Sequence, residues 1–569
     1  MEKQHLIDIA AKKKKAAVVF KDVAVIDVYS RETIRTDVAI DAGYIVAIGD
    51  GYDGEVEYHD PTWTLAPSFI DSHVHIESSM VPPHEFAKAV LPLGVTTVIA
   101  DPHEIANVNG ALGIEYMLAD AKGLPLDVRM MLPSCVPATP FEHAGAKLYA
   151  EDLAPFLGDP GVHGLGEVMD YPSVEAGSED MLQKIAQTEQ AGKVVDGHAS
   201  GLNPDQLNVY RSAGIMTDHE CTTAEEAIER VRRGFYVQIR EGSVARNVEK
   251  VSLAVTESNA HRFLFCTDDK HLDDLVAEGG IDYNIRTAIK QGVKPETAYA
   301  IASLHAAEAY GLKEVGAIAP GKKANFVILS DVESVKIEQV YVNGTLVAEK
   351  GNATFESEGI EVPKPMKGEL ALPELTAESF RLAASEEEID VIQVLPNSLL
   401  TKRQRLTFQP DASGADLSQD IATLAVIERH HGTGHMALAP VTGFGLKRGA
   451  LAATVAHDSH NLVVAGVSPE DMLLAARTLE KVGGGIVAVS EGEVLAALPL
   501  EIGGLMTKRP YREVAEILEQ LNDALDVVEA HRHFNPYLTM SFLALPVIPD
   551  LKLTDMGLFD VTTFSFINA

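Results

Sequence analysis

Two histidines separated by one residue are candidate metal ligands. His73 and His75 come at the end of an apolar run. On a β-strand, residues two apart lie on the same face, so both imidazoles would point into one site. A second such pair, His531 and His533, follows a helix-like segment at 517–529, and on a helix residues two apart diverge. The setting of each pair therefore has to decide whether it binds metal.

Further imidazoles and carboxylates end other apolar runs. A metal that activates water needs neutral imidazoles and carboxylates that leave one side open to substrate. The candidate metal ligands are His73, His75, Glu167, His198, His219 and Asp268. Glu167 could bridge two metals. Taken alone, each has a structural alternative, such as a turn-forming role for Asp268. Taken together, they favour a metal centre.

Alternating strands and helices would bring these residues together. From Pro67 onward, apolar strand-like runs alternate with amphipathic helical segments, which is typical of parallel βα units. The eight predicted strands span residues 65–75, 96–101, 128–135, 162–167, 193–198, 215–219, 236–240 and 262–268. Eight such strands predict a (β/α)8 barrel of the TIM type, whose strand ends meet at one mouth. All six candidate ligands would share that mouth.

The segments on both sides of the barrel predict two further domains. Short β-like runs, among them 17–20 and 23–28, precede the barrel, and runs of similar texture follow it. We therefore predict an α/β fold: a (β/α)8 barrel flanked by a small β-sandwich domain made from both sides of the barrel, plus a C-terminal α/β (or α+β) domain. The predicted boundaries are 1–66 and 316–365 for the small β-domain, 67–315 for the metal-binding barrel, 366–379 for a linker and 380–569 for the C-terminal domain.

Histidines also gather in the C-terminal part of the chain. The cluster comprises His430, His431, His435, His457, Asp458 and His460, among several glycines. It could form another metal site or cover the barrel mouth, but glycines of this kind are equally consistent with tight turns at an interface. We favour a structural use.

Composition limits the classes of partner. A chain of 569 residues is too long for a single core. Its formal charge of −36 argues against nucleic acid or an anionic membrane as the main partner. The sequence contains no stretch of ~20 apolar residues, so we predict no membrane span. The three cysteines are far apart and lack CxxC spacing, which points to a reducing cytosol. We expect a cytoplasmic protein that binds a small molecule.

Several motifs of the chain resemble those of a known family. Pro67-Ser68-Phe69-Ile70-Asp71-Ser72-His73-Val74-His75 is similar to the first-strand motif of the amidohydrolase superfamily, Pro-Gly-Phe-Ile-Asp-x-His-x-His, with Ser68 in place of the glycine. More narrowly, the chain resembles the bacterial adenine deaminases of that superfamily. The segments that carry this resemblance are 75–80, 100–108, 166–172, 239–243, 266–269 and, in the C-terminal domain, 456–461.

The resemblance implies an activity and a cofactor. It implies purine salvage by hydrolysis of adenine to hypoxanthine and ammonia, with a metal-activated hydroxide attacking carbon 6. It also implies a binuclear Mn²⁺ or Fe²⁺ site, although Zn²⁺ suits the same ligands. By analogy, Asp268 accepts the proton of the nucleophile and passes it to the departing amine. Glu167 either bridges the metals or protonates a ring nitrogen.

Six other polar residues are candidates for substrate binding or for support of the ligands. They are Asp101, His103, Glu104, Arg240, Glu241 and Ser134. The first three could contact the metal, its surroundings or the base, or form a polar turn. Arg240 and Glu241 could bind the purine edge or pair with each other, and Ser134 could simply line the pocket.

Two other functions stay open. One is an amidohydrolase acting on another cyclic amide or N-acyl substrate, and the other is a non-catalytic barrel that serves in assembly. We expect a homo-oligomer, either a dimer or a tetramer.

Overall fold

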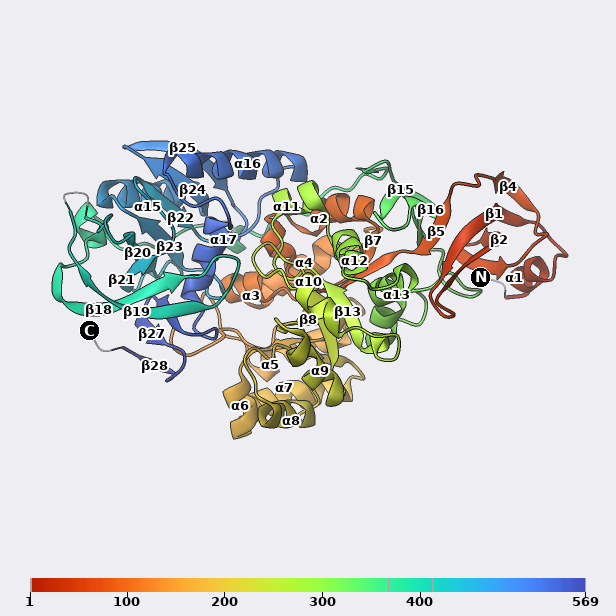
Figure 1. Ribbon diagram of the computed structural model, residues 1–569, viewed down its shortest axis with the longest axis horizontal. Helices are drawn as coiled ribbons and strands as arrows, with labels where there is room; N and C mark the ends of the chain where they lie inside the picture. Colours follow the sequence, from red (N-terminus) through yellow and green to blue (C-terminus); the bar gives the residue numbers. More distant parts are fainter. Residues whose placement is uncertain (1–2, 367, 412–413, 568–569) are drawn as a thin grey trace.

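The computed structural model describes residues 3–366, 368–411 and 414–567. It has three parts in a row along its long axis (Figure 1). A β-sheet built from both flanks of the barrel lies at one end, the barrel lies in the centre, and the C-terminal sheet domain lies at the other end. None of the helices in these described stretches combines the length and the apolar character needed to cross a bilayer.

The flanking sheet has nine strands that come from both sides of the barrel. The first five are β1 (Ala16–Asp27), β2 (Glu32–Asp41), β3 (Tyr44–Ile48), β4 (Gly54–Tyr58) and β5 (Thr64–Pro67), preceded by helix α1 (Lys3–Ala10). The last four are β14 (Phe326–Asp331), β15 (Lys336–Val342), β16 (Thr345–Glu349) and β17 (Asn352–Ala353). The antiparallel pairing of β14 with β5 joins the two halves. The runs predicted at 17–20 and 23–28 form one strand, because the register shift between Phe20 and Val23 interrupts β1 without ending it.

The predicted barrel is confirmed. Its strands are β6 (Phe69–Val74), β7 (Val95–Ala100), β8 (Asp127–Leu132), β9 (Val162–Val168), β10 (Val194–Gly197), β11 (Thr217–Asp218), β12 (Tyr236–Arg240) and β13 (Phe263–Cys266). Strands β6 to β10 form one parallel sheet, and β11 to β13 form another. A parallel bridge between Val74 and Asp268 joins the two sheets at the β6–β13 side. Residues 65–67, predicted as the start of the first barrel strand, belong to β5 instead.

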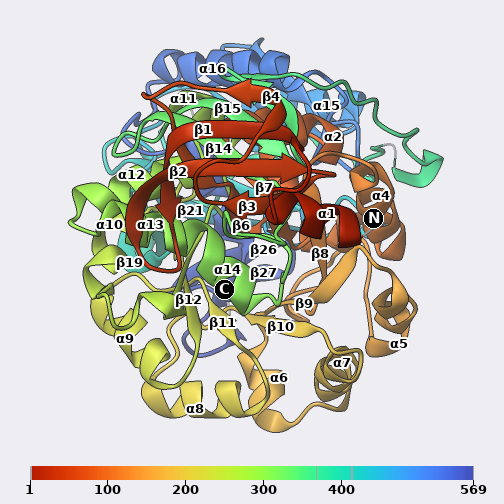
Figure 2. The ribbon, with the colours of Figure 1, turned by 90° about the vertical axis from the view of Figure 1, so that its right-hand side faces the viewer.

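Helices surround these strands (Figure 2). They are α2 (Pro83–Val90), α3 (His103–Asn109), α4 (Ala111–Ala121), α5 (Ala150–Leu153), α6 (Tyr171–Ala176), α7 (Glu179–Gln190), α8 (Pro204–Ser212), α9 (Ala224–Arg232), α10 (Val248–Val251), α11 (Leu272–Glu278), α12 (Ile281–Lys290), α13 (Pro295–Ala300) and α14 (Ala306–Ala309). Strand residues such as Phe263 and Phe265 are fully buried, as expected for parallel strands covered by helices.

The C-terminal domain is a mixed sheet with helices packed on it. Its eight strands lie in the order β19 (Thr401–Phe408), β18 (Ser385–Val394), β21 (Met436–Thr442), β20 (Ile421–Ile427), β23 (Leu462–Gly466), β22 (Ala450–Ala453), β24 (Gly485–Ser490) and β25 (Glu493–Pro499). Helices α15 (Pro469–Val482) and α16 (Tyr511–Val527) pack on this sheet. Helix α17 (Pro536–Ser541) and a small sheet of β26 (Leu551–Thr554), β27 (Gly557–Asp560) and β28 (Ser565–Phe566) end the chain. Within the sheet β18 pairs in parallel with β21, and the other pairs are antiparallel.

Candidate metal centre

The first histidine pair converges on one point at the end of β6. His73 Nε2 and His75 Nε2 lie 3.1 Å apart, and both side chains are buried. His75 Nδ1 lies 2.9 Å from the carbonyl oxygen of Asp101, so Nδ1 carries the proton and Nε2 is left with its lone pair. Asp268 Oδ1 lies 3.4 Å from His73 Nε2 and 3.1 Å from His75 Nε2. Three ligand atoms from β6 and the loop after β13 therefore face one another.

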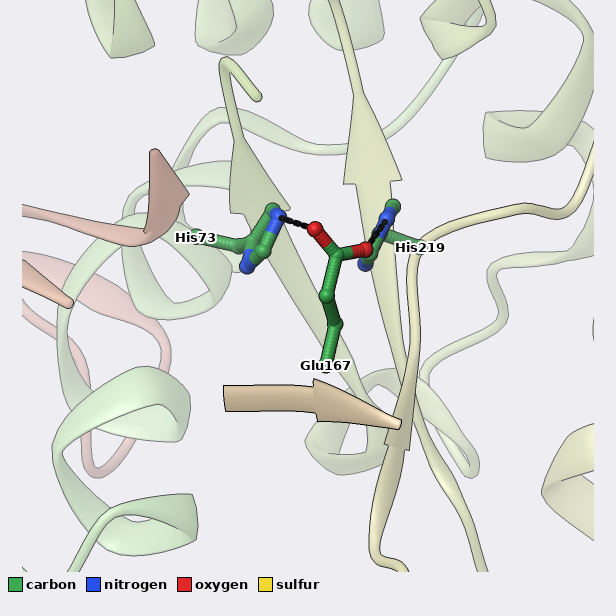
Figure 3. Close-up of side chains that lie close together, drawn as sticks. All are labelled: His73, Glu167 and His219. Carbon is green, nitrogen blue, oxygen red and sulfur yellow. Dashed lines mark ion pairs between the residues drawn. The ribbon is translucent and has the colours of Figure 1, made fainter. Parts of the chain in front are cut away.

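Glu167 lies between this group and His219. Its Oε1 is 3.3 Å from His75 Nε2 and 3.9 Å from His73 Nε2, whereas its Oε2 is 3.2 Å from His219 Nε2 (Figure 3). The rings of His73 and His219 stack on each other with their centroids 4.1 Å apart, and one oxygen of the carboxylate faces each ring. One carboxylate thus presents an oxygen to each of two histidine groups, which is the arrangement a bridging ligand needs.

His198 completes the second group together with Glu220, which was not predicted. The ring of His198 lies 5.3 Å from that of His219. Glu220 Oε1 lies 3.7 Å from His198 Nε2 and 3.8 Å from His219 Nε2. Glu220 directly follows His219 in the chain, but its residue type alone gives no signal that separates it from the many surface glutamates.

Arg240 holds two of the carboxylates. Its Nη1 lies 2.7 Å from Asp268 Oδ2 and also donates to Glu220. Arg240 therefore does not form the alternative pair with Glu241. That residue accepts a hydrogen bond from the backbone N–H of Val248 and lies outside the lining of the central cavity.

The electrostatic setting keeps the two central carboxyl groups ionised. Burial alone would raise the pKa of Asp268, but the Arg240 guanidinium and the two histidines of β6 hold it well below its usual value. Burial likewise opposes ionisation of Glu167, and the neighbouring imidazoles, His103 first among them, hold its pKa well below the usual range. Ionised carboxylates beside imidazoles are the donor set that divalent metals prefer.

Asp268 is held in an unusual backbone conformation. Its φ of 58° lies in the left-handed region, which non-glycine residues rarely adopt. Its backbone N–H donates to the His73 carbonyl, and its own carbonyl accepts from the His75 N–H. These two bonds fix the carboxylate against the histidine pair, so the local strain coincides with the candidate site.

The polar residues after β7 surround the centre. Asp101 Oδ2 accepts a hydrogen bond from the backbone N–H of Glu167 at 3.0 Å. His103 Nδ1 lies 3.2 Å from Glu167 Oε1, and His103 Nε2 lies 3.6 Å from Asp458 Oδ1 of the C-terminal domain. Glu104 is buried and accepts a hydrogen bond from Ser78. Ser134 donates to the carbonyl of Glu167 and lines a separate cavity.

The C-terminal domain closes the cavity over the barrel mouth. The cavity is lined by side chains from the barrel and by Leu399, His457, Asp458, Phe542, Leu545 and Ile548. The four apolar residues were not predicted, since an apolar side chain at a site has the same local sequence as one in a core. His430 and His431 lie elsewhere, with their Nε2 atoms 2.7 Å from the Ser459 carbonyl and 2.9 Å from the Ala144 carbonyl.

The donor set fits a metal centre. Ligand atoms of His73, Glu167 and His219 all lie within 4.8 Å of one another, as do those of His73, His75 and Asp268. Five of the six predicted ligands belong to sets that share His73, His75 or Glu167, and the sixth, His198, lies beside them with its ring 5.3 Å from that of His219. All six are buried, and the ring atom His219 Nδ1 has no hydrogen-bond partner within the part of the chain that the structure describes.

Comparison with known proteins identifies the family. Residues 64–347 match the amidohydrolase family, and residues 398–565 match the adenine deaminase C-terminal domain. The chain is 49% identical over 565 residues to the adenine deaminase of Bacillus pumilus, a match that covers 99% of this chain and 98% of that protein. It is 49% identical to the enzyme of Geobacillus kaustophilus over 99% of this chain and 98% of that protein. It is 46% identical to that of Bacillus subtilis over the full length of both.

The chain belongs to the adenine deaminase family. This confirms the resemblance drawn from the first-strand motif and from the segments that follow it. The adenine deaminase match extends through the C-terminal domain that closes the cavity, so the family likeness covers the roof of the site as well as the barrel. The protein is thus an enzyme of a metal-dependent hydrolase family.

Proposed function

We propose that this protein catalyses the hydrolytic deamination of adenine to hypoxanthine and ammonia. The observation that carries the proposal is the position of Glu167, whose two oxygens face His75 and His219 on opposite sides. Family membership over the whole chain supports adenine as the substrate.

The cofactor that we propose is a pair of Mn²⁺ or Fe²⁺ ions. His73, His75 and Asp268 would hold one ion, His198 and His219 would hold the other, and Glu167 would bridge them. The bound pair would supply a water molecule acidified enough to attack carbon 6 of the purine. Zn²⁺ suits the same imidazoles and carboxylates, so the donor set alone does not select the metal.

Asp268 is the residue we assign to proton transfer. Its Oδ1 faces the histidine pair of β6, and its Oδ2 is held by Arg240, so the carboxylate cannot turn away from the reaction centre. Ionised Asp268 would take a proton from the attacking water and give it to the departing amine. Because both oxygens of Glu167 face imidazoles, we assign Glu167 to bridging rather than to protonation of the ring.

The remaining walls of the cavity suit a planar heteroaromatic base. Leu399, Phe542, Leu545 and Ile548 form an apolar roof opposite the charged floor. Such a roof would bury the faces of a purine and keep bulk water away from the polar groups at the barrel mouth.

The test is a substrate screen on metal-loaded enzyme. The protein is stripped with a chelator, reconstituted with Mn²⁺ and offered adenine, adenosine, cyclic amides and N-acyl sugars, with ammonia measured for the purines. Release of ammonia from adenine that depends on added metal is the expected result. Turnover of a cyclic amide or N-acyl substrate instead of adenine would favour another amidohydrolase reaction. A fully loaded protein that turns over none of them would favour an assembly role.

Two further properties belong to the same proposal. Three buried free cysteines support a cytoplasmic location, where thiols stay reduced. We also propose a homo-oligomer, which light scattering of the metal-loaded protein would measure.

A further inference from the structure

A second group of unpartnered ligands lies where the C-terminal domain meets the barrel. His103 starts helix α3 on the barrel, while His457 and Asp458 belong to the loop between β22 and β23. The three residues are 4%, 1% and 2% exposed, and one ligand atom from each lies within 4.8 Å of the others. None of the three is among the six ligands proposed for the metal pair.

A carboxylate lies near the Nδ1 atom of each imidazole in this group. His103 Nδ1 lies 3.2 Å from Glu167 Oε1, and His457 Nδ1 lies 3.6 Å from Glu104 Oε1. Neither contact is a hydrogen bond, because the His457 distance is too long and His103 Nδ1 has no hydrogen-bond partner among the described residues. Histidines that bind metals commonly have a carboxylate in this position. The negative charge near each Nδ1 favours a proton on that nitrogen, which would leave the lone pair of Nε2 to act as a ligand.

The ligand atoms themselves lack partners. His103 Nε2, His457 Nε2 and Asp458 Oδ2 make no hydrogen bond within the described parts of the chain. His103 Nε2 and Asp458 Oδ1 lie 3.6 Å apart, which is too long for a hydrogen bond but common for two ligands of one ion. Leaving such atoms buried and unpaired costs free energy, and a bound cation would remove that cost.

The buried negative charge around this group also favours a bound cation. Glu77, Glu104 and Asp458 are buried around this interface, and no lysine or arginine of the described residues forms an ion pair with any of them. Buried carboxylates without a basic partner favour a proton or a cation nearby.

His460 does not belong to the ligand group, although it is buried next to Glu104. Its Nδ1 accepts a hydrogen bond from the backbone N–H of Ala456 at 3.1 Å. The proton of the neutral ring must then be on Nε2, which faces Glu104 Oε2 at 4.0 Å. His460 is thus a hydrogen-bond donor, which limits the set to two imidazoles and one carboxylate.

We propose that His103 Nε2, His457 Nε2 and the Asp458 carboxylate bind a third divalent transition-metal ion that fastens the C-terminal domain to the barrel mouth. Two nitrogens and one oxygen suit Zn²⁺, Mn²⁺ or Fe²⁺, whereas Ca²⁺ and Mg²⁺ prefer all-oxygen sites. The three residues also line the cavity assigned to adenine, but the inference is tested separately, because it concerns different ligands and is measured by metal content.

The test counts ions by mass spectrometry in full-length protein that has been stripped, reloaded with Mn²⁺ and desalted. We expect three ions per chain in the wild type and two in His457→Ala and Asp458→Asn. The control His435→Ala removes an exposed histidine of the same domain and should keep three. The double variant His73→Ala/His75→Ala probes the metal pair alone and should still retain the third ion.

The same count separates the two proposals. Two ions in both the wild type and His457→Ala would overturn the third site and leave the pair intact. A double variant with as many ions as the wild type would instead contradict the metal pair. If the variants prove poorly folded, anomalous diffraction from Mn²⁺-loaded wild-type crystals replaces them. A peak between His103, His457 and Asp458 is expected, and its absence beside an occupied pair would overturn the inference. Asp458→Asn with a raised KM for adenine but an unchanged ion count would assign Asp458 to substrate binding, again overturning it.

Discussion

Glu167 and Asp268 are two buried carboxylates of the same site, but their contacts suit them to different tasks. Both oxygens of Glu167 face imidazoles, whereas one oxygen of Asp268 faces the histidine pair and the other accepts a hydrogen bond from Arg240. A carboxylate with an imidazole at each oxygen is placed to ligate metal on both sides. A carboxylate held by a permanent cation stays ionised and available as a base.

Replacing each carboxylate by its amide should separate these tasks. We expect Glu167→Gln and Asp268→Asn each to reduce kcat for adenine by at least ~10². General acid–base assistance typically contributes ~10² to 10⁴ to the rate. Glu167→Gln should also lower the metal content, because an amide cannot bridge two cations. The exposed Glu516→Gln on helix α16 serves as the control. Unchanged kcat in Asp268→Asn would remove Asp268 from the proton path.

Arg240 should matter for stability as well as for turnover. Arg240→Met leaves Glu220 and Asp268 buried without their shared cation, and breaking such a pair costs roughly 3–5 kcal/mol. Adding Glu220→Gln removes one of the stranded charges, so the double variant should be more stable than Arg240→Met alone. Denaturant unfolding of the wild type, Arg240→Met, Glu220→Gln and the double variant measures the coupling, with the exposed Arg232→Met as control. A double variant less stable than Arg240→Met would contradict this account.

At the level of elements, the chain order of the barrel made the main ligands predictable. Parallel strands end at one mouth, so polar residues after successive apolar runs had to meet there. No such rule places residues that lie outside the predicted barrel strands. Glu220 follows a two-residue strand, and Phe542 comes from a distant domain, so only the fold shows that they line the same cavity. The strands β18, β19, β21 and β25 of the C-terminal sheet were not predicted either, and polar residues alternate irregularly in β18 and β19.

Strand β9 offers an element-level test, because Gly166 leaves room for a neighbouring side chain. A Cβ at Gly166 would lie 2.0 Å from Asp101 Oδ2, the atom that accepts the N–H of Glu167. Gly166→Ala should therefore displace Asp101, shift Glu167 and reduce both metal content and kcat by roughly tenfold or more, since outer partners of metal ligands are typically worth 10- to 100-fold. The control Gly158→Ala has nothing within 4 Å of the added Cβ. Full metal loading and activity in Gly166→Ala would show that this strand tolerates the shift.

At the level of the whole molecule, the roof of the cavity depends on a lysine from the last sheet. Lys552 of β26 is fully buried, and its Nζ donates to the carbonyls of Leu399 and Phe542, both of which line the cavity. Burial lowers the pKa of Lys552 to about 7. The amine thus joins two segments that are 143 residues apart without needing a permanent charge.

This lysine gives the protein a specific dependence of stability on pH. Below pH 7 the side chain is protonated in both the folded and the unfolded chain, and the folded chain must bury the charge. Between pH 7 and about 10 the unfolded lysine keeps its proton while the folded one has lost it, so stability rises with pH, by at most ~1.4 kcal/mol per pH unit. Lys552→Met cannot show this rise. The difference in unfolding midpoint, wild type minus Lys552→Met, should therefore increase from pH 6 to pH 9, whereas the same difference for the exposed Lys122→Met should stay flat. A difference that is flat for both variants would mean that Lys552 keeps its charge when buried, and the roof would then rest on an ammonium instead of a neutral amine.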